Sequence, residues 1–521
     1  MATDCDVLII GSGFGGAVNA CRLASAGAKV IVLERGRRWT PQTFPRKPDD
    51  PWVWDEGNPV ARHGWWDFRV FPHMTVVQGA GVGGGSLVYA NISVEAKPDT
   101  FTSGWPQEIT YSGLKPHYET AGKMLGAAKV PANQLPARTR LLREAAEKAG
   151  FGNLFEQLPL AVTFDEHWPS TEPDRYDAKY SKTHINEHGV EQGTCVHLGN
   201  CDIGCDVNAR NTLDLNYLAV AEKKGADVRP LHLVRDIKPI AGGGFQVAFE
   251  RIVDGMMKGG SLTAKRVVVA AGSLGSTHLL LLSKASGSLP KLSPRLGFGW
   301  SSNGDFLTPA IHPFRDVEPS RGPTITAAIN LLNGEYQGKS IFIEDGGIPD
   351  IGRAFLDELS KEPHSDPRAQ RMAATLLPLF AGGGLLKNIM PWFAQSRDAA
   401  DGRMRLDAGR LMLDWDVTAS EDTMNAVTSM HRKLAFLTEG LPLTPLTWTA
   451  GRDLITPHPL GGCNMATEPG KGVVDFRGQV FNYPGLYVAD GSIVPKALGL
   501  NPSRTIAALA EHIAAGIAAG L

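Results

Sequence analysis

Residues 4–34 constrain the fold more than any other part of this 521-residue chain. Residues 4–10 are apolar almost throughout, as in a parallel strand buried on both faces. The sequence Gly-Ser-Gly-Phe-Gly-Gly follows at once, and then come a helical pattern over 17–26 and a second strand over 29–33. Glu34 closes that strand, about 20 positions after the glycines. This order of elements predicts a dinucleotide-binding unit on a parallel sheet.

Each glycine of this motif has a distinct expected task. Gly11 permits the tight turn, Gly13 lets the backbone approach a pyrophosphate, and Gly16 lets the helix pack closely on the strand. The helix N-terminus then faces the phosphates, and Glu34 is placed to accept both ribose hydroxyls. A glycine-rich turn without a ligand is the alternative, and the flanking strands and the acidic residue favour the cofactor site.

A second glycine-rich loop, over residues 78–87, indicates which dinucleotide is bound. Two separate glycine loops around one long dinucleotide indicate FAD, because the backbone N–H groups of both loops are then available to the pyrophosphate or the flavin ring. Asn91 lies just beyond the loop, where its side chain is placed to bond the flavin. The alternative is a tight crossing of two chain segments that only glycine permits. The residues of this region expected at the cofactor are Gly79, Gly83, Gly84, Ser86 and Asn91.

Later segments return to the same nucleotide-binding unit. Residues 265–271 form a strand pattern that runs into a glycine turn and a helix beginning at Ser276 or Thr277. Residues 485–490 form another strand pattern, and an alanine-rich helix over 505–519 closes the chain. The residues expected to contact the cofactor here are Val234 at the adenine, Ala271, Gly272, Asp490 and Pro502.

A histidine and an asparagine near the C-terminus are the candidate catalytic groups. His458 is followed by Pro-Leu-Gly-Gly, and such a turn holds the imidazole outside regular structure, where it can face a ligand. Imidazole titrates near neutrality and is the usual general base. The amide of Asn501, in the sequence Gly-Leu-Asn-Pro, donates and accepts hydrogen bonds without changing charge.

The chain changes in character from about residue 301 onward. Residues 350–403 have helical apolar spacing, which fits either ordinary core or a lid over a lipid-like substrate or a membrane interface. Glu344 ends a strand pattern before Asp-Gly-Gly, a position from which its carboxylate can point into a cavity. A turn-flanking surface carboxylate is the alternative for Glu344.

Three cysteines, Cys195, Cys201 and Cys205, lie close together in the sequence. Their spacing is similar to that of an iron–sulfur ligand run that lacks one cysteine. The other interpretation is a set of small buried thiols in a glycine-rich loop near the cofactor. This second interpretation is favoured, and no metal site is predicted.

Composition limits the partners and the location. A formal net charge of −2 argues against nucleic acid, because phosphate binding needs clustered Lys and Arg. No uninterrupted apolar stretch of about 18 residues predicts a transmembrane helix, and the first apolar run is too short for a secretory signal. We therefore expect a cytoplasmic protein, for which peripheral contact with a membrane is left open.

Four ordered motifs resemble those of the glucose–methanol–choline (GMC) flavoprotein oxidoreductases. They are GSGFGG with Glu34, GAGVGGGSLV, GSLGSTHLLL, and YVADGSIVP followed by LNPSRTIAALAE, and the similarity spans nearly the whole chain. The sequence HPLGGC at His458 and the Asn-Pro at Asn501 are most similar to the cholesterol oxidase branch, because other branches carry a second histidine in place of the asparagine.

This resemblance implies an α/β fold with a Rossmann-like FAD-binding domain and a second, sheet-based substrate domain. The cofactor would be noncovalent FAD, because Val88 and Tyr89 stand in the region where family members with covalent FAD carry a histidine. The FAD-binding domain would comprise residues 1–100, 192–300 and 455–521, and the substrate domain residues 101–191 and 301–454, with a helical insert at 350–403.

The resemblance also implies the chemistry. A carbinol hydride would go to the flavin, while His458 accepts or orients the hydroxyl proton and Asn501 holds the hydroxyl and the flavin edge. Glu344 lies at about the place of the glutamate that moves a proton when sterol oxidases isomerise a double bond. The expected substrate is a lipophilic, sterol-like alcohol, with oxygen as acceptor and hydrogen peroxide as product. The alternative is an alcohol or sugar dehydrogenase that passes electrons to a protein or quinone.

Overall fold

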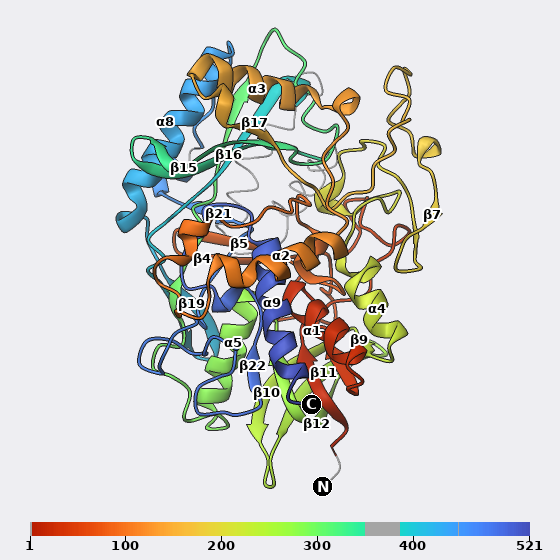
Figure 1. Ribbon diagram of the computed structural model, residues 1–521, viewed down its shortest axis with the longest axis vertical. Helices are drawn as coiled ribbons and strands as arrows, with labels where there is room; N and C mark the ends of the chain where they lie inside the picture. Colours follow the sequence, from red (N-terminus) through yellow and green to blue (C-terminus); the bar gives the residue numbers. More distant parts are fainter. Residues whose placement is uncertain (1–2, 350–385, 446) are drawn as a thin grey trace.

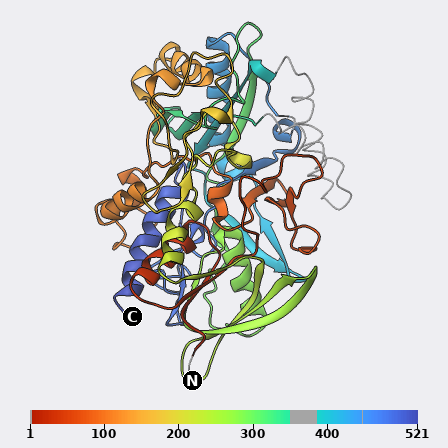
Figure 2. The same cartoon turned by 90° about the vertical axis from the view of Figure 1, so that its right-hand side faces the viewer.

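The computed structural model describes residues 3–349, 386–445 and 447–521. A seven-stranded sheet lies at one end of the molecule and a six-stranded sheet at the other, with a smaller four-stranded sheet between them (Figure 1). Figure 2 shows the same arrangement after a 90° turn, with both chain termini at the end that holds the seven-stranded sheet. Chain segments far apart in sequence therefore meet in the middle of the molecule.

The seven-stranded sheet has the order β10-β11-β12-β1-β2-β9, and β22 pairs with β12. Its centre is parallel, as predicted, because β12, β1, β2, β9 and β22 all pair in parallel. The outer part is an antiparallel meander of β10, β11 and β12, which the sequence analysis divided differently: β12 is longer than predicted and β11 was missed. The strands are β1 Cys5–Ile10, β2 Val30–Leu33, β9 Asp227–Arg229, β10 His232–Pro239, β11 Phe245–Val253, β12 Met256–Val269 and β22 Leu486–Val488.

Helices cover this sheet, and α1 and α5 begin earlier than predicted. Helix α1 begins at Phe14, and α5 begins at Gly272, because the glycines after each strand belong to the first helical turn. Arg22 on α1 joins Glu511 on α9 through two hydrogen bonds of 2.7 Å. The helices at this end are α1 Phe14–Ser25, α2 Tyr111–Met124, α4 Tyr217–Lys223, α5 Gly272–Ala285 and α9 Ser503–Ala518.

The six-stranded sheet is antiparallel, with the order β20-β14-β17-β16-β15-β6. Helices α3 (Ala137–Ala149) and α8 (Glu421–Leu437) pack against it (Figure 1). Its strands are β6 Phe155–Gln157, β14 Phe306–Ile311, β15 Ala327–Tyr336, β16 Lys339–Asp345, β17 Ile389–Ser396 and β20 Leu441–Pro442.

The predicted helical insert at 350–403 is wrong where the structure describes it. Strand β17 runs between β14 and β16, and Trp392 within it is fully buried. A short apolar run buried on both faces has no period that separates strand from helix, which explains the error. Residues 350–385 lie outside the described part of the chain.

A hairpin follows β17, formed by β18 (Gly402–Asp407) and β19 (Arg410–Asp414). This hairpin pairs with β13 (Phe298–Trp300). A second small hairpin joins β7 (His184–Ile185) and β8 (Glu191–Gln192).

The four-stranded sheet brings two predicted site segments together. Strand β21 (Leu454–Thr456) pairs in parallel with β5 (Met74–Gly79), and β5 pairs with β4 (Trp66–Phe71), which pairs with β3 (Val53–Trp54). The second glycine loop begins where β5 ends, and His458 lies just after β21. Both site segments therefore start from this sheet.

No helix in the described part of the chain is long and apolar enough to cross a membrane. The division into two domains stays a prediction.

Candidate active site

A cavity of about 510 Å³ lies where the two large sheets face each other across the four-stranded sheet. Both glycine loops, the ends of β2 and β12, and the segment from His458 contribute to its wall. The predicted residues that line it are Gly11, Gly13, Glu34, Gly79, Gly84, Val234, Ala271, Gly272, His458, Asp490, Asn501 and Pro502.

The glycines of the two loops have different physical roles. A Cβ atom on Gly16 would lie 2.0 Å from the carbonyl oxygen of Gly11, and one on Gly84 would lie 2.5 Å from the Cα of Gly13. These two glycines are needed for packing, between helix and strand and between the two loops. A Cβ on Gly13 meets no atom closer than 3.9 Å, so the space beside Gly13 is open to a ligand.

Glu34 lies at the end of β2 and lines the cavity, as expected. Its carboxylate already accepts hydrogen bonds from the Ser12 N–H at 3.0 Å, the Ser12 hydroxyl at 2.7 Å and the Gly36 N–H at 2.9 Å. A carboxylate has about four acceptor positions, so about one is left for a ribose hydroxyl rather than the two that were expected.

Val234 also lines the cavity, as expected of a residue that meets the cofactor. It lies within β10, next to a break in the register between β10 and β11 at residues 234–236. Such a bulge changes the direction of a strand locally.

The carboxylate of Asp490 makes its hydrogen bonds to other residues of the cavity wall. One carboxylate oxygen accepts from the Gly272 N–H at 2.8 Å and the Ser276 hydroxyl at 2.5 Å. The other accepts from the N–H and the hydroxyl of Ser492, at 2.8 and 2.5 Å. Burial raises the pKa of Asp490, and these donors oppose that rise. The carboxylate therefore ties the start of α5 to the end of β22.

Gly83, Ser86 and Asn91 do not line the cavity, contrary to expectation. The Ser86 hydroxyl donates to the Gly83 carbonyl at 2.8 Å and accepts from the Leu213 N–H at 3.0 Å. The side-chain oxygen of Asn91 accepts from Arg210 at 2.7 Å, and its amide nitrogen is buried without a hydrogen-bond partner among the described residues. The hydrogen bonds of these residues therefore stabilise the conformation of the second glycine loop.

Arg210, which sequence reasoning missed, fixes that loop. Its buried guanidinium donates to the carbonyls of Ser86, Leu87 and Tyr89 at 2.7, 2.7 and 3.0 Å, and to Asn91. A lone arginine far along the chain carries no sequence signal for this role.

His458 is held by a carboxylate that the sequence analysis did not identify. Its Nδ1 lies 2.9 and 3.1 Å from the two carboxylate oxygens of Asp305, which is fully buried, while the imidazole is 17% exposed. Thr456 supports both residues, because its hydroxyl donates to Asp305 at 2.6 Å and accepts from the His458 N–H at 2.9 Å. Since a carboxylate accepts, Nδ1 carries the proton and Nε2 keeps its lone pair.

Asn501 lies in the cavity wall with His458 and is 4% exposed. Its side-chain oxygen is buried and has no hydrogen-bond partner among the described residues. Asn303, also missed, fixes the preceding chain: its oxygen accepts from the N–H groups of Leu498 and Gly499 at 3.0 and 2.9 Å, and its amide donates to the Leu500 carbonyl at 2.9 Å. The amide of Asn501 is thus positioned and has bonding capacity for a ligand.

Glu344 is not the surface carboxylate that one interpretation favoured, and it does not line the cavity either. It is fully buried beneath the wall, and neither carboxylate oxygen has a hydrogen-bond partner of good geometry in the described chain. Burial raises the pKa of Glu344 well above its ordinary value, an effect that the nearby amides of Gln395 and Asn501 oppose. Both polar atoms of the Gln395 amide are likewise unpartnered, so a buried polar cluster adjoins Asn501.

The rest of the wall near His458 is apolar. The phenyl ring of Phe393 lies 6.3 Å from the imidazole, centroid to centroid. Leu307 and Ile455 are 39% and 37% exposed, so they belong to the rim rather than to the core. The apolar side chains of this wall are Leu307, Ile325, Ile348, Pro391, Phe393 and Ile455.

The three clustered cysteines are free thiols in the structure. Burial raises the pKa of Cys195 and of Cys205, and each thiol is influenced by its neighbours. Within residues 3–349, 386–445 and 447–521, no group of three or more His, Cys, Asp or Glu side chains is arranged to hold a metal ion.

The chain is similar to known proteins over nearly its whole length. Residues 398–510 match the profile of the GMC oxidoreductases, and residues 9–65 match an NAD(P)-binding Rossmann-like domain. A cholesterol oxidase from Acinetobacter baumannii is 34% identical, over 98% of this chain and 93% of the relative. A cholesterol oxidase from Mycobacterium tuberculosis is 31% identical, over 99% of this chain and 91% of the relative.

The fold is shared with a more distant solved structure, the pyridoxine 4-oxidase described from Mesorbium loti. It aligns over 98% of this chain and 99% of its own, with a TM-score of 0.63 and 18% identity. The open space at Gly13, the remaining acceptor position of Glu34 and the unpartnered Asn501 oxygen fit a bound FAD. The chain belongs to the GMC oxidoreductases, FAD-dependent enzymes that oxidise alcohols at the CH–OH group.

Proposed function

We propose that this enzyme oxidises a hydroxyl group of a bulky, lipophilic, sterol-like alcohol to the ketone, with oxygen as acceptor and hydrogen peroxide as product. The observation that carries the proposal is the pair of His458 and Asn501 beneath an apolar wall in one cavity. The names of the relatives that are similar over nearly the whole chain support a sterol as the substrate class.

In this proposal His458 is the general base. Asp305 keeps the proton on Nδ1, so that the Nε2 lone pair is available to the substrate hydroxyl. When the imidazole accepts a proton it becomes a cation, and the buried carboxylate of Asp305 stabilises that charge. The dyad therefore both orients the base and favours its charged form.

Asn501 and the apolar wall position the alcohol. The unpartnered oxygen of Asn501 accepts a hydrogen bond from the substrate hydroxyl or from the cofactor edge. The apolar side chains contact the hydrocarbon body of the substrate and exclude water from the reacting carbon. Bound FAD supplies the hydride acceptor.

We also propose that Glu344 moves a proton during double-bond isomerisation of a sterol product. Its burial holds it in the neutral form, in which a carboxylic acid can donate as well as accept. Its neighbour Asn501 lines the cavity, so Glu344 lies close to the place proposed for the substrate.

An anaerobic reduction experiment tests the proposal. Purified, FAD-loaded protein is mixed with a panel of sterols and simple alcohols, and loss of the oxidised flavin absorbance is followed. A sterol should bleach the flavin, and readmitted oxygen should restore it with formation of peroxide. His458→Asn should slow bleaching by about 100-fold or more while FAD stays bound.

The alternatives give different results in the same experiment. Bleaching only by sugars or short alcohols, or reoxidation only by an added quinone, would assign the enzyme to the electron-transferring dehydrogenases. An unchanged bleaching rate in His458→Asn would remove His458 from the mechanism, whatever the substrate is.

A further inference from the structure

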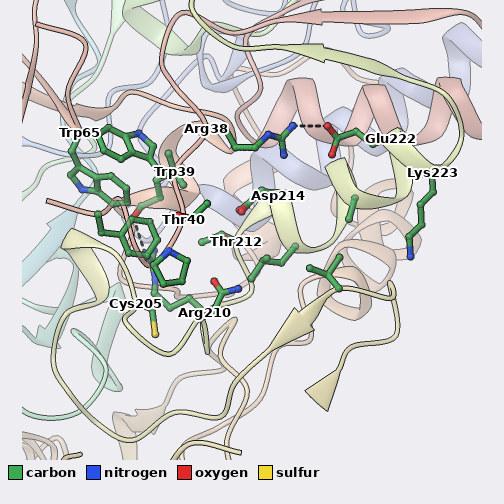
Figure 3. Close-up of a pocket in the computed structure, with 17 residues that line it drawn as sticks. Arg38, Trp39, Thr40, Trp65, Cys205, Arg210, Thr212, Asp214, Glu222 and Lys223 are labelled. Atoms are coloured by element: carbon green, nitrogen blue, oxygen red, sulfur yellow. Dashed lines mark hydrogen bonds and ion pairs between the residues drawn. The ribbon is translucent and has the colours of Figure 1, made fainter. Parts of the chain in front are cut away.

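The active-site cavity contains an acidic side chain that the proposed mechanism does not use. Asp202 belongs to the loop of clustered cysteines, between Cys201 and Cys205, and it lines the active-site cavity. Cys205 lies instead at the neighbouring pocket drawn in Figure 3, which shares no lining residue with the active-site cavity in the described chain. The loop therefore separates two spaces, and Asp202 belongs to the one that holds His458 and Asn501.

Neighbouring segments fix the position of Asp202, which lies in a short 3₁₀ turn. Its backbone carbonyl accepts a hydrogen bond from the indole N–H of Trp65 at 3.1 Å. The guanidinium of Arg46 donates to the next two carbonyls, those of Ile203 and Gly204, both at 2.8 Å. These bonds hold the turn on both sides, so the carboxylate has a defined place at the cavity.

Only one oxygen of the Asp202 carboxylate is engaged by the protein. Thr324, which also lines the cavity, donates its hydroxyl to Oδ1 at 3.0 Å. Oδ2 makes no hydrogen bond within the described chain, and it is not shut off from solvent. Ile325 and Ile348, which line the same part of the cavity, are apolar. A free acceptor in apolar surroundings forms a strong hydrogen bond with a ligand that donates.

The charges around Asp202 favour a neutral donor. Burial raises the pKa of Asp202 to about 6, and the buried guanidinium groups of Arg210 and Arg138 oppose that rise. An ammonium group on the ligand would add a third cation beside these two, and an anionic group would be repelled by the carboxylate itself. A hydroxyl group can donate to Oδ2 without either penalty.

This acceptor lies well away from the candidate base. The imidazole of His458 lies 6.3 Å from the ring of Phe393 on β17, centroid to centroid, whereas Thr324 precedes β15. Strand β16 lies between β17 and β15, so the two positions are about two strand spacings, or about 10 Å, apart. That separation is comparable with the length of a fused-ring sterol nucleus, so one rigid molecule can reach both groups.

We propose that Asp202 and Thr324 form a second polar subsite of the substrate cavity, which binds a neutral hydroxyl group at the end of the substrate opposite the oxidised carbon. The substrate class is then a rigid, lipophilic alcohol with a hydroxyl group at each end. The far hydroxyl donates to Oδ2 of Asp202. This inference rests on the proposed function, because the assignment of His458 as the base defines which end is oxidised.

Equilibrium dialysis of two labelled steroids against the FAD-loaded protein tests the subsite, without oxygen and at about pH 8, where the Asp202 carboxyl is ionised. The steroids are testosterone and androstenedione, which differ only at one end of the ring system. Testosterone carries a hydroxyl group there, and androstenedione carries a ketone that cannot donate. Testosterone should bind about tenfold or more tightly than androstenedione.

Two variants of the same loop assign this preference to one residue. In Asp202→Asn the side chain keeps its size, but an amide can turn either its oxygen or its NH₂ group to the ligand, so the preference should fall to about threefold or less. Asp206→Asn is the matched control, because Asp206 pairs with Arg46 and lies outside the active-site cavity. It should keep the preference of the parent.

The comparison of the two steroids on the parent needs no variant, so the test stays decisive if a variant fails to fold. Absence of binding, equal binding of both steroids, an unchanged preference in Asp202→Asn, or the same loss in Asp206→Asn would overturn the subsite. Failure of the proposed function gives a different result. Testosterone would then bind with the expected preference, while no sterol bleaches the flavin.

Discussion

The pairing of Asp305 with His458 allows a test of the proposed role of His458 as general base. Asp305→Asn removes the negative charge beside the imidazole, while the Thr456 hydroxyl keeps another acceptor, the Ser302 carbonyl oxygen at 2.8 Å. The amide oxygen is then free to accept the Nδ1 proton from the position of the carboxylate oxygen that lies 2.9 Å from Nδ1. The tautomer is kept, but the imidazolium that forms when Nε2 takes the substrate proton loses its counter-charge.

The expected loss follows from the interaction that is removed. A hydrogen bond between charged groups contributes about 1.5–3 kcal/mol. Each 1.36 kcal/mol is a tenfold change in rate, so the anaerobic bleaching rate should fall roughly 10- to 150-fold. FAD binding should be unchanged, because Asp305 does not line the cavity.

Two comparisons separate this effect from a general loss of structure. Asp398→Asn changes a half-buried carboxylate, held by Ser301 and Ser302, and should leave the rate within about threefold of the parent. In a His458→Asn background, Asp305→Asn should have almost no further effect, because the two residues act as a unit. Additive losses in the double variant, or a rate for Asp305→Asn alone within threefold of the parent, would refute the dyad.

The remaining predictions concern the buried carboxyl group and the glycines. Because the pKa of Glu344 is raised in the folded state, its stabilising effect is complete below the ordinary glutamate pKa and is lost as the pH rises toward the folded pKa. Glu344→Gln should therefore gain stability over the parent as the pH rises above about 5, by up to about 1.4 kcal/mol per pH unit, in denaturant titrations. A difference that does not vary with pH would contradict the neutral form. Gly13→Ala should leave the melting temperature of the apoprotein nearly unchanged but weaken FAD binding about tenfold or more, measured by flavin fluorescence, because the added methyl group meets only open space. Gly16→Ala should unfold or strongly destabilise the apoprotein, since its Cβ would overlap the Gly11 carbonyl. Equal effects of the two glycine variants on apoprotein stability would refute this division of roles.

Much of the nucleotide-binding unit could be predicted from sequence because its signals are local. The order of strand, glycine turn and helix, and the acidic residue at the end of β2, depend on backbone conformation within a short segment. The same locality explains the errors at α1 and α5, where glycines in the first helical turn were taken for turn residues. Strand β17 was missed because a short run buried on both faces shows no period.

The candidate site was predicted in part for the same reason. His458 and Asn501 stand in distinctive local sequences, but Asp305, Asn303 and Arg210 do not. Each of these three residues acts on a segment far along the chain, through contacts with His458, with residues 498–500 and with the second glycine loop. Sequence spacing carries no information about such contacts.

The sequence by itself determined the fold class and the family and pointed to His458 as the candidate base, because motifs of this kind encode local backbone geometry and chemistry together. Only the tertiary structure decided which glycines serve packing and which leave room for the cofactor. It also decided that Asn91 faces Arg210 and that Glu344 lies buried beside Asn501. These outcomes depend on how distant strands and loops pack, because packing sets the burial, the protonation state and the hydrogen-bond partners of each side chain.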